Sequence, residues 1–217
     1  GVFQVLNKSS GVFDLGDEEL LTILSSQAAI AVQNALLLEA QKKTFDSFVK
    51  TLAATIDARD PITAGHSYRV MRYCTAMGEV LKLTRDDKEV LRYAALLHDF
   101  GKIGVRESIL CKPGQLTLEE YRHIQKHVVY TEELLKKIYF SKKFSNIPVI
   151  AGGHHEKFDG TGYPRGLTGE DINYLSRIMA VADVFDAITF KRHYRDPMPI
   201  KQALDVLLQD SGTHFDP

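Results

Sequence analysis

The sequence predicts an all-α protein in which one short strand precedes a long N-terminal helix. Apolar residues recur at steps of three and four in several separate segments, which is the period of one helix face. No glycine or proline occurs between Gly16 and Pro61, so one uninterrupted helix is expected over residues 17–57. Residues 1–7 are the segment that reads as a strand.

The predicted first helix begins at Asp17, Glu18 and Glu19, because acidic side chains favour a helix start. Its apolar positions then alternate steps of four and three over roughly five heptads, with an interruption at Lys42. Such a coiled-coil seam favours a parallel homodimer, and a single helix packed on its own domain is the alternative. The seam comprises Leu24, Ala28, Ala31, Ala35, Leu38, Phe45, Val49, Leu52 and Ile56.

Further helical segments follow in chain order. His66 opens a pattern whose apolar face includes Val70 and Cys74, and residues 90–97 are apolar enough for a buried helix that stops near Gly101. A stripe over residues 121–138 predicts one more helix, and the apolar segment 178–188 predicts the last. Cys74 is expected to be a buried thiol.

Seven histidine and aspartate side chains occur where such groups need strong partners. An aspartate at the end of a buried helix, or inside an apolar one, is costly unless it is paired or bound to a metal. Taken singly, each residue has an ordinary reading, such as a hydrogen-bonded core histidine or an exposed carboxylate. Taken together they indicate metal binding: His66, His98, Asp99, His127, His154, His155 and Asp183.

This ligand set suits two metal ions better than one. Seven nitrogen and oxygen ligands are too many for a tetrahedral ion, and structural zinc usually recruits cysteine. Imidazoles, carboxylates and one aspartate available as a bridge suit two divalent ions roughly 3.5–4 Å apart, the arrangement that assists phosphoryl displacement. The ligand types are compatible with iron, manganese, zinc, nickel or cobalt.

The ordered motifs resemble the HD-GYP domain, a subgroup of the HD metal-dependent phosphohydrolase superfamily, over about residues 50–217. They are RDPITAGHSYRV (59–70), HD with the following GK (98–102), KPGQLTLEEYRHIQKH (112–127), HHEKFDGTGYP (154–164) and ADVFDAIT (182–189). The resemblance implies an HD-type helical bundle that hydrolyses cyclic di-GMP to linear pGpG and in some cases to GMP. A cyclic di-GMP receptor with slow or no turnover is the alternative.

Carried over position by position, the resemblance makes all seven residues metal ligands, with Asp99 as the bridging carboxylate. It places Lys102 beside the scissile phosphate as a catalytic group together with Asp99. Arg192 and Arg195 are expected to bind the substrate phosphates, because a guanidinium fork fits phosphate oxygens. A solvated basic loop is the other reading of these two arginines.

The loop after the two adjacent histidines has two interpretations. Gly162 and Tyr163 form either a wall of the substrate site and a docking surface for diguanylate cyclase domains, or a shaped turn that holds His154 and His155. Three further carboxylates are expected to support the site without binding a metal. Glu156 and Asp159 are expected to orient ligand imidazoles, and Asp186 is expected to cap a helix or pair with Arg192.

One departure from the family pattern concerns the number of metals. Some three-metal members carry a glutamate four residues before the first ligand histidine, and here that position is Ile62, which cannot coordinate. Two divalent transition-metal ions are therefore expected, with iron or manganese favoured.

The N-terminal part resembles the last strand and helix of a GAF sensory domain. The segments are GVFQVLNKSSGVF and LLTILSSQAAIAVQNALLL. The expected organisation is therefore a GAF-like remnant over residues 1–40, a linker helix over 17–57 and a catalytic domain over 50–217. Such a piece is expected to come from a longer protein in which a sensor signals along the helix.

The amino-acid composition limits the classes of binding partner and indicates the cellular compartment. The 27 Lys and Arg residues against 28 Asp and Glu residues give a formal charge of −1, so no basic field for duplex nucleic acid exists. Two cysteines without CxxC spacing favour a reducing cytoplasm. No membrane-spanning segment is expected from the apolar pattern.

Overall fold

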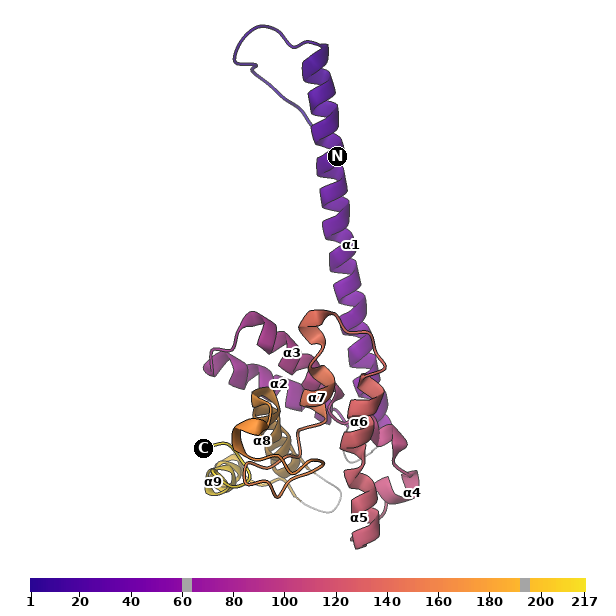
Figure 1. Ribbon diagram of the computed structural model, residues 1–217, viewed down its shortest axis with the longest axis vertical. Helices are drawn as coiled ribbons and strands as arrows, with labels where there is room; N and C mark the ends of the chain where they lie inside the picture. Colours follow the sequence, from indigo (N-terminus) through magenta and orange to yellow (C-terminus); the bar gives the residue numbers. More distant parts are fainter. Residues whose placement is uncertain (60–63, 192–195) are drawn as a thin grey trace. The chain divides into compact units, whose positions relative to one another are not determined.

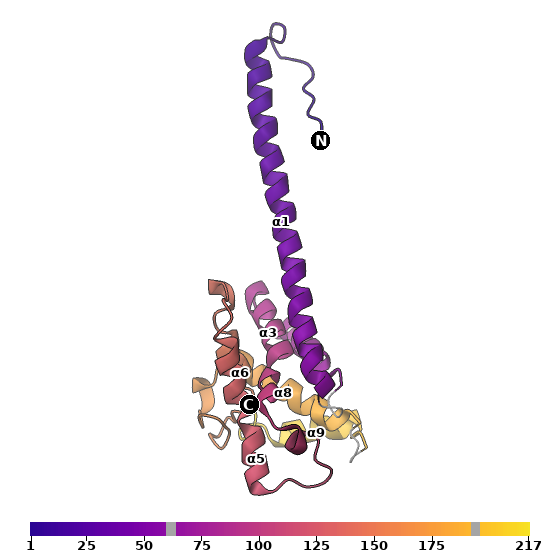
Figure 2. The same ribbon diagram turned by 90° about the vertical axis from the view of Figure 1, so that its right-hand side faces the viewer.

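The computed structural model describes residues 1–59, 64–191 and 196–217, and its regular elements are helices (Figures 1 and 2). The prediction of an all-α protein is confirmed, but the predicted strand over residues 1–7 is wrong for the described chain, because those residues adopt no regular structure. A strand needs a neighbour to complete its hydrogen-bond ladder, and none pairs with this segment. The GAF-like remnant is therefore not shown.

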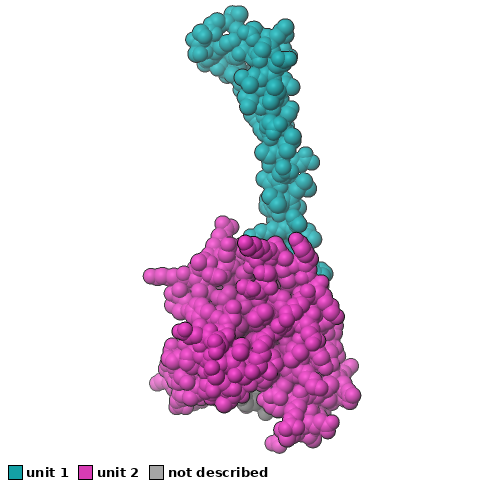
Figure 3. Space-filling model, viewed as in Figure 1, with its two compact units in different colours: residues 1–48 teal, residues 49–217 magenta. Residues whose placement is uncertain are grey.

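The chain divides into two compact units, residues Gly1–Phe48 and Val49–Pro217, which are coloured separately in Figure 3. Helix α1 (Leu15–Arg59) begins in the first unit and ends in the second. Apolar side chains of the first unit are exposed, including Leu24 at 54% and Leu38 at 66%. These two residues belong to the predicted seam, so within the first unit no neighbouring helix covers them.

Helix α1 also bears on the expectation that nothing spans a membrane. It contains an 18-residue window of mean hydropathy 1.5 with few charges, so it meets a length and composition criterion for a membrane span. Core helices of soluble proteins pass the same test. The criterion alone therefore does not distinguish a membrane helix from a dimerisation helix.

The second unit is a helical bundle whose helices begin at recognisable caps. Helix α2 (His66–Val80) packs on α3 (Arg85–Leu97) and on α8 (Tyr174–Thr189). The Thr84 side chain accepts a hydrogen bond from the Asp87 amide at the start of α3, and the Asn173 side chain accepts one from the Leu175 amide at the start of α8. Each cap satisfies an amide that lacks a partner inside its own helix.

Shorter elements complete the bundle between α3 and α8. They are the 3-10 helices η1 (Phe100–Gly104), η2 (Lys142–Phe144) and η3 (Gly169–Asp171) and the α-helices α4 (Glu107–Leu110), α5 (Leu118–Gln125), α6 (His127–Leu135) and α7 (Ile147–Ala151). Helix α9 (Ile200–Gln209) follows and packs on α8. The single helix predicted over 121–138 is wrong, because a break at Lys126 separates α5 from α6.

The core of the second unit lies where α3, α7 and α8 meet. Its fully buried side chains include Tyr93 and Leu97 from α3, Ile150 from α7 and Met179 from α8. Burial of each such side chain contributes about 1.5–3 kcal/mol relative to exposure. Cys74 of α2 is also fully buried, as predicted. These contacts bring the ends of α3 and α7 close to the middle of α8.

Candidate metal centre

The predicted ligands converge from elements that are far apart in the sequence. His66 is the first residue of α2, His98 follows the last residue of α3, and His127 is the first residue of α6. His154 and His155 follow α7, while Asp99 precedes η1 and Asp183 lies within α8. All except the partly exposed His155 are buried.

Three groups of three ligand atoms form within this cluster. Two of them share no residue, and the third joins His98, Asp99 and His154. His66, His98 and Asp183 can each present an atom such that all three lie within 4.8 Å of one another. The same holds for His127, His154 and His155. In the first group, the distance from His66 Nε2 to Asp183 Oδ1 is 3.1 Å. In the second, His127 Nε2 lies 3.4 Å from His154 Nε2.

Asp99 contacts both groups through different oxygens. Its Oδ2 lies 3.4 Å from His98 Nε2 and 3.8 Å from His66 Nε2, whereas its Oδ1 lies 3.3 Å from His127 Nε2. A carboxylate with one oxygen toward each of two ligand groups has the geometry of a bridging ligand. The arrangement therefore fits two ions that share Asp99.

The hydrogen bonds of the imidazoles leave their metal-binding nitrogens available. The Nδ1 atoms of three rings lie close to the carbonyl oxygen three residues earlier, at 2.7, 2.8 and 2.6 Å for His98, His127 and His154. A carbonyl oxygen only accepts, so each Nδ1 carries a proton, and each Nε2 has a lone pair when its ring is neutral. His98 Nε2 is buried and makes no hydrogen bond within the described residues. An orphaned buried nitrogen of this kind fits a metal ligand.

Charge differs between the two groups. Burial lowers the pKa of His66, but the hydrogen bonds that His66 donates to Asp183 and Asp186 outweigh burial and raise it to about 9. Burial dominates at His155 and lowers its pKa to about 3, and it also holds the pKa of His154 well below the usual range. Metal ligation requires neutral imidazole. The second group is therefore neutral at pH 7, while His66 must give up a proton to bind a metal.

Lys102 lies beside the shared carboxylate. Its Nζ is 2.7 Å from Asp99 Oδ2, and its side chain is 15% exposed. Burial raises the pKa of Asp99, but Lys102 and His98 outweigh this effect and hold that pKa well below its usual range. Asp99 is thus ionised at neutral pH and suited to cations, and Lys102 places a positive charge beside it.

Thr131 is a supporting residue that sequence reasoning missed. It is fully buried in α6, its hydroxyl donates to the His98 carbonyl at 2.9 Å, and its oxygen accepts from the Gly101 amide at 2.8 Å. Gly101 approaches α6 so closely that an added Cβ would lie 1.9 Å from the His127 carbonyl. The sequence predicted only that a helix stops near Gly101. The close packing of Gly101 involves Thr131 of α6, which lies 30 residues later in the chain.

Asp186 orients a ligand histidine. Its Oδ2 lies 2.7 Å from His66 Nδ1, and both its oxygens accept hydrogen bonds from the Arg69 guanidinium at 2.7 and 2.9 Å. Arg192 lies outside the described residues, and the partners of Asp186 within them are His66 and Arg69. These contacts replace the expected helix cap, and the expected pair with Arg192 stays a prediction. The sequence contained one indication of this role. Asp186 follows Asp183 by three residues, which places both aspartates on one face of α8.

The loop after His155 packs against the ligand rings. The Tyr163 ring stacks on His155 with centroids 4.8 Å apart, and the Tyr163 amide donates to the His155 carbonyl at 3.1 Å. A Cβ added to Gly162 would lie 2.2 Å from the Lys157 amide nitrogen, so only glycine fits there. Both residues support the interpretation of a turn that holds the two histidines.

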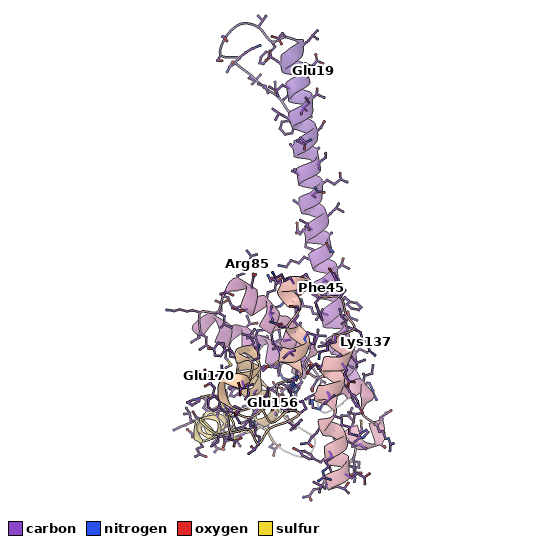
Figure 4. All side chains as sticks on the ribbon, in the orientation of Figure 1. Glu19, Phe45, Arg85, Lys137, Glu156 and Glu170 are labelled. Carbon is purple, nitrogen blue, oxygen red and sulfur yellow. The ribbon has the colours of Figure 1, made fainter. Side chains whose placement is uncertain are left out.

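The roles predicted for Glu156 and Asp159 are wrong. Glu156, which is buried and labelled in Figure 4, accepts hydrogen bonds from the Arg165 and Leu167 amides at 2.8 and 3.0 Å. Asp159 accepts from the amide and hydroxyl of Thr161. Both carboxylates shape the loop backbone, which satisfies its amides, and neither of them orients an imidazole.

Three predicted positions cannot be placed. Ile62 lies in the segment 60–63, and Arg192 and Arg195 lie in the segment 192–195, both outside the described residues. The third-metal question and the phosphate-binding arginines therefore rest on the sequence alone.

Comparison with known proteins now identifies the class. A family model described as "HD domain" matches residues 50–217, and the chain belongs to this family. The solved structure of Bd1817, described as an HDG"Y"P protein from Bdellovibrio bacteriovorus, matches with a TM-score of 0.54 at 24% identity, over 69% of this chain and 47% of that one. This similarity supports the fold and agrees with the predicted HD-type helical bundle.

Curated relatives are named as cyclic dinucleotide phosphodiesterases. The chain is 40% identical to "3′3′-cGAMP-specific phosphodiesterase 3" of Vibrio cholerae, over 92% of this chain and 41% of the relative. It is 36% identical to a "Cyclic di-GMP phosphodiesterase" of the same organism, over 94% and 43%. It is also 36% identical to the cyclic di-GMP phosphodiesterase response regulator RpfG of Xanthomonas campestris, over 88% and 51%. The chain thus spans about half of the length of these relatives or less.

Proposed function

We propose that this chain contains the catalytic domain of a metal-dependent phosphodiesterase that hydrolyses cyclic dinucleotides. The observation that carries the proposal is the position of Asp99, whose two oxygens face two different groups of ligand side chains. Two divalent ions, if bound by these residues, would supply Lewis acidity for phosphodiester hydrolysis. Names of relatives at 36–40% identity support the same class of substrate.

The proposed ligand assignment follows the two groups. His66, His98 and Asp183 would hold one ion, His127, His154 and His155 would hold the other, and Asp99 is available to both groups. The Nδ1–carbonyl hydrogen bonds fix His98, His127 and His154 with Nε2 toward the site. Two ions are proposed rather than three, and iron or manganese is proposed because the ligand set mixes imidazoles with carboxylates.

Lys102 is proposed as the catalytic cation. Its ammonium group lies 2.7 Å from the shared carboxylate and is 15% exposed, so it is close to the ions yet accessible to a ligand. In that position it stabilises charge that develops on the phosphate, or it donates a proton to the leaving ribose 3′ oxygen. Such a group raises the rate without contributing a metal ligand.

Substrate binding is assigned to the two arginines and to the loop. Arg192 and Arg195 are proposed to bind the phosphates through their guanidinium forks. Tyr163 and Gly162 are proposed to form a wall of the site, because the Tyr163 ring already lies on His155. A docking role for this loop toward diguanylate cyclase domains, and a cytoplasmic location where cyclic dinucleotides would be met, are parts of the same proposal.

Two cyclic dinucleotides are proposed as candidate substrates. The family motifs favour cyclic di-GMP, whereas three of the relatives are named for 3′3′-cGAMP, at 40%, 38% and 37% identity. The two nucleotides differ in one purine base and share both phosphodiester linkages. A centre built around phosphate chemistry fits either, so the base contacts decide between them.

The test combines metal analysis with turnover on one sample. Protein purified without oxygen is analysed for metal and incubated with cyclic di-GMP and, separately, with 3′3′-cGAMP, with an Asp99→Ala variant alongside. Two equivalents of metal, and a linear product that the variant does not form, would support the proposal. A metal-replete protein that binds a cyclic dinucleotide without cleaving it would instead make it a receptor, the second candidate function.

A further inference from the structure

We propose that Asp57 and Arg59, at the end of α1, are positioning residues that set the geometry of the metal centre. Asp57 acts on the ligand His66 through Ser67, and Arg59 acts on Lys102 through the backbone of η1. This inference rests on the proposed phosphodiesterase function. It assigns to the last turn of α1 a direct control of both the ligand set and the catalytic cation.

Asp57 caps α2 from another helix. The residue before α2 is Gly65, which has φ 69° and provides no side-chain cap. The Asp57 carboxylate replaces that cap, because Oδ2 accepts from the Ser67 amide at 3.2 Å and Oδ1 accepts from the Ser67 hydroxyl at 2.7 Å. Unsatisfied amides at a helix start need such an acceptor. Here the acceptor lies ten residues earlier in the chain and is 7% exposed.

The cap lies directly beside a proposed ligand. His66 is the first residue of α2 and Ser67 is the second, so two bonds to Ser67 fix the backbone from which the His66 ring projects. Asp186 holds the same ring at Nδ1, 2.7 Å away. Orientation of His66 therefore needs both contacts, one at the backbone and one at the ring. Loss of either weakens a metal site, because outer contacts orient the ligands.

Arg59 holds the element that carries Lys102. Its Nη1 donates to the Ile103 carbonyl at 2.8 Å and to the Lys102 carbonyl at 3.3 Å, and its Nη2 donates to the Val105 carbonyl at 3.4 Å. These carbonyls lie at the end of η1 and just after it, and the Lys102 carbonyl also accepts a hydrogen bond from the Val105 amide at 3.0 Å. A planar guanidinium can bind several such oxygens at once, which a lysine ammonium on a flexible stem does less well.

The two contacts share one turn of one helix. Val49, Ala53 and Ile56 bury the same end of α1 in the core of the second unit. A rotation or axial shift of this turn changes the Asp57–Ser67 and Arg59–η1 distances together. A capping role alone would stabilise the fold, whereas a positioning role changes metal affinity and turnover in the folded protein.

The proposed roles of Asp57 and Arg59 are tested by different measurements. Asp57→Ala and Asp57→Asn are tested for cobalt affinity by absorption titration, with the exposed Asp205→Asn as the matched control. Arg59→Ala and Arg59→Lys are tested for kcat and KM with bis(p-nitrophenyl) phosphate and with the cyclic dinucleotides, with the exposed Arg72→Ala as control. Circular dichroism and thermal unfolding establish that each variant is folded.

We expect Asp57→Ala to weaken cobalt affinity about 10-fold to 100-fold, with a smaller loss for Asp57→Asn. We expect Arg59→Ala to lower kcat by about 10-fold or more at unchanged KM and metal content, because a small displacement of a catalytic group has a large effect. Arg59→Lys should restore part of the rate. If an alanine variant does not fold, its conservative partner decides the outcome.

Wild-type cobalt affinity in folded Asp57 variants, or a wild-type kcat in folded Arg59 variants, would overturn the inference. A lower melting temperature with normal affinity and kcat would also overturn it, because that result indicates a structural cap only. Cobalt titration does not depend on turnover. If the wild-type protein hydrolysed none of the three substrates, the proposed function would fail while the Asp57 assignment would still be decided.

Discussion

His66 and Asp186 are 120 residues apart in the sequence, and their side chains meet at 2.7 Å between Nδ1 and Oδ2. The contact keeps a proton on His66 Nδ1 and turns Nε2 toward Asp183 and Asp99. A carboxylate that holds a ligand imidazole in this manner fixes both its orientation and its tautomer. Asp186, three residues after Asp183, thus supports a ligand of the candidate metal centre.

Replacement of Asp186 tests this role. Asp186→Ala removes the acceptor for His66 Nδ1 and the partner of the Arg69 guanidinium. We expect metal affinity to fall about 10-fold to 100-fold, measured by cobalt titration in a folded variant. Asp205→Ala on the exposed side of α9 is the control. Equal affinities for the two variants would contradict the assignment.

Lys102 is tested separately from the ligands. Lys102→Met preserves the length of the side chain and removes its charge beside Asp99. We expect kcat to fall by about 10²–10⁴ with the metal retained, because proton transfer or charge stabilisation is lost. The exposed Lys201→Met variant should behave as wild type. Turnover at the wild-type rate with full metal content would remove Lys102 from the chemistry.

Replacement of Thr131 should lower the stability of the folded protein. Thr131→Val keeps the shape of the side chain but leaves the buried His98 carbonyl and Gly101 amide without this partner. We expect a loss of about 1–3 kcal/mol, which corresponds to a decrease of several degrees in melting temperature. The exposed Thr55→Val variant loses one intrahelical hydroxyl bond and should change little. Similar melting temperatures for both variants would contradict the bridging role.

Metal affinity should depend on pH through His66. Its pKa is raised to about 9 in the metal-free protein, so the ring is protonated at pH 7 and an ion must displace that proton. Affinity therefore rises as pH increases toward about 9 and falls as pH decreases. His155, with a pKa of about 3, releases no proton at pH 7. Calorimetry in buffers of different ionisation enthalpy should detect proton release, and a buffer-independent heat would count against it.

The N-terminal helix is proposed to dimerise. Leu24 and Leu38 of its predicted seam are 54% and 66% exposed, and a parallel partner helix would cover them. Ala31→Pro breaks the helix between these residues, at a cost of about 3 kcal/mol or more. Sedimentation should show a shift from dimer to monomer. An unchanged sedimentation coefficient, or a wild-type protein that is already monomeric, would reject the seam.

Local patterns were sufficient to predict the helices that carry the site. The apolar face that begins at His66 and the apolar run before His98 both became helices with those histidines at their ends. Hydrophobic periodicity and helix capping depend on residues that are only a few positions apart, so they can be recognised in the sequence. The break at Lys126 was missed because the apolar stripe continues through it, and the strand over residues 1–7 lacked the partner that a strand requires.

The sequence by itself determined which side chains have metal-ligand chemistry and the order in which they occur, because residue type and motif spacing are local properties. Only the tertiary structure decided how they divide into two groups around Asp99, which proton each imidazole carries, and that Thr131 and Asp186 support them. It also decided that the last turn of α1 contacts Ser67 and η1. The contacts of Thr131, Asp186, Asp57 and Arg59 join residues 10 to 120 positions apart. Their distances follow from the packing of whole helices, which no local pattern encodes.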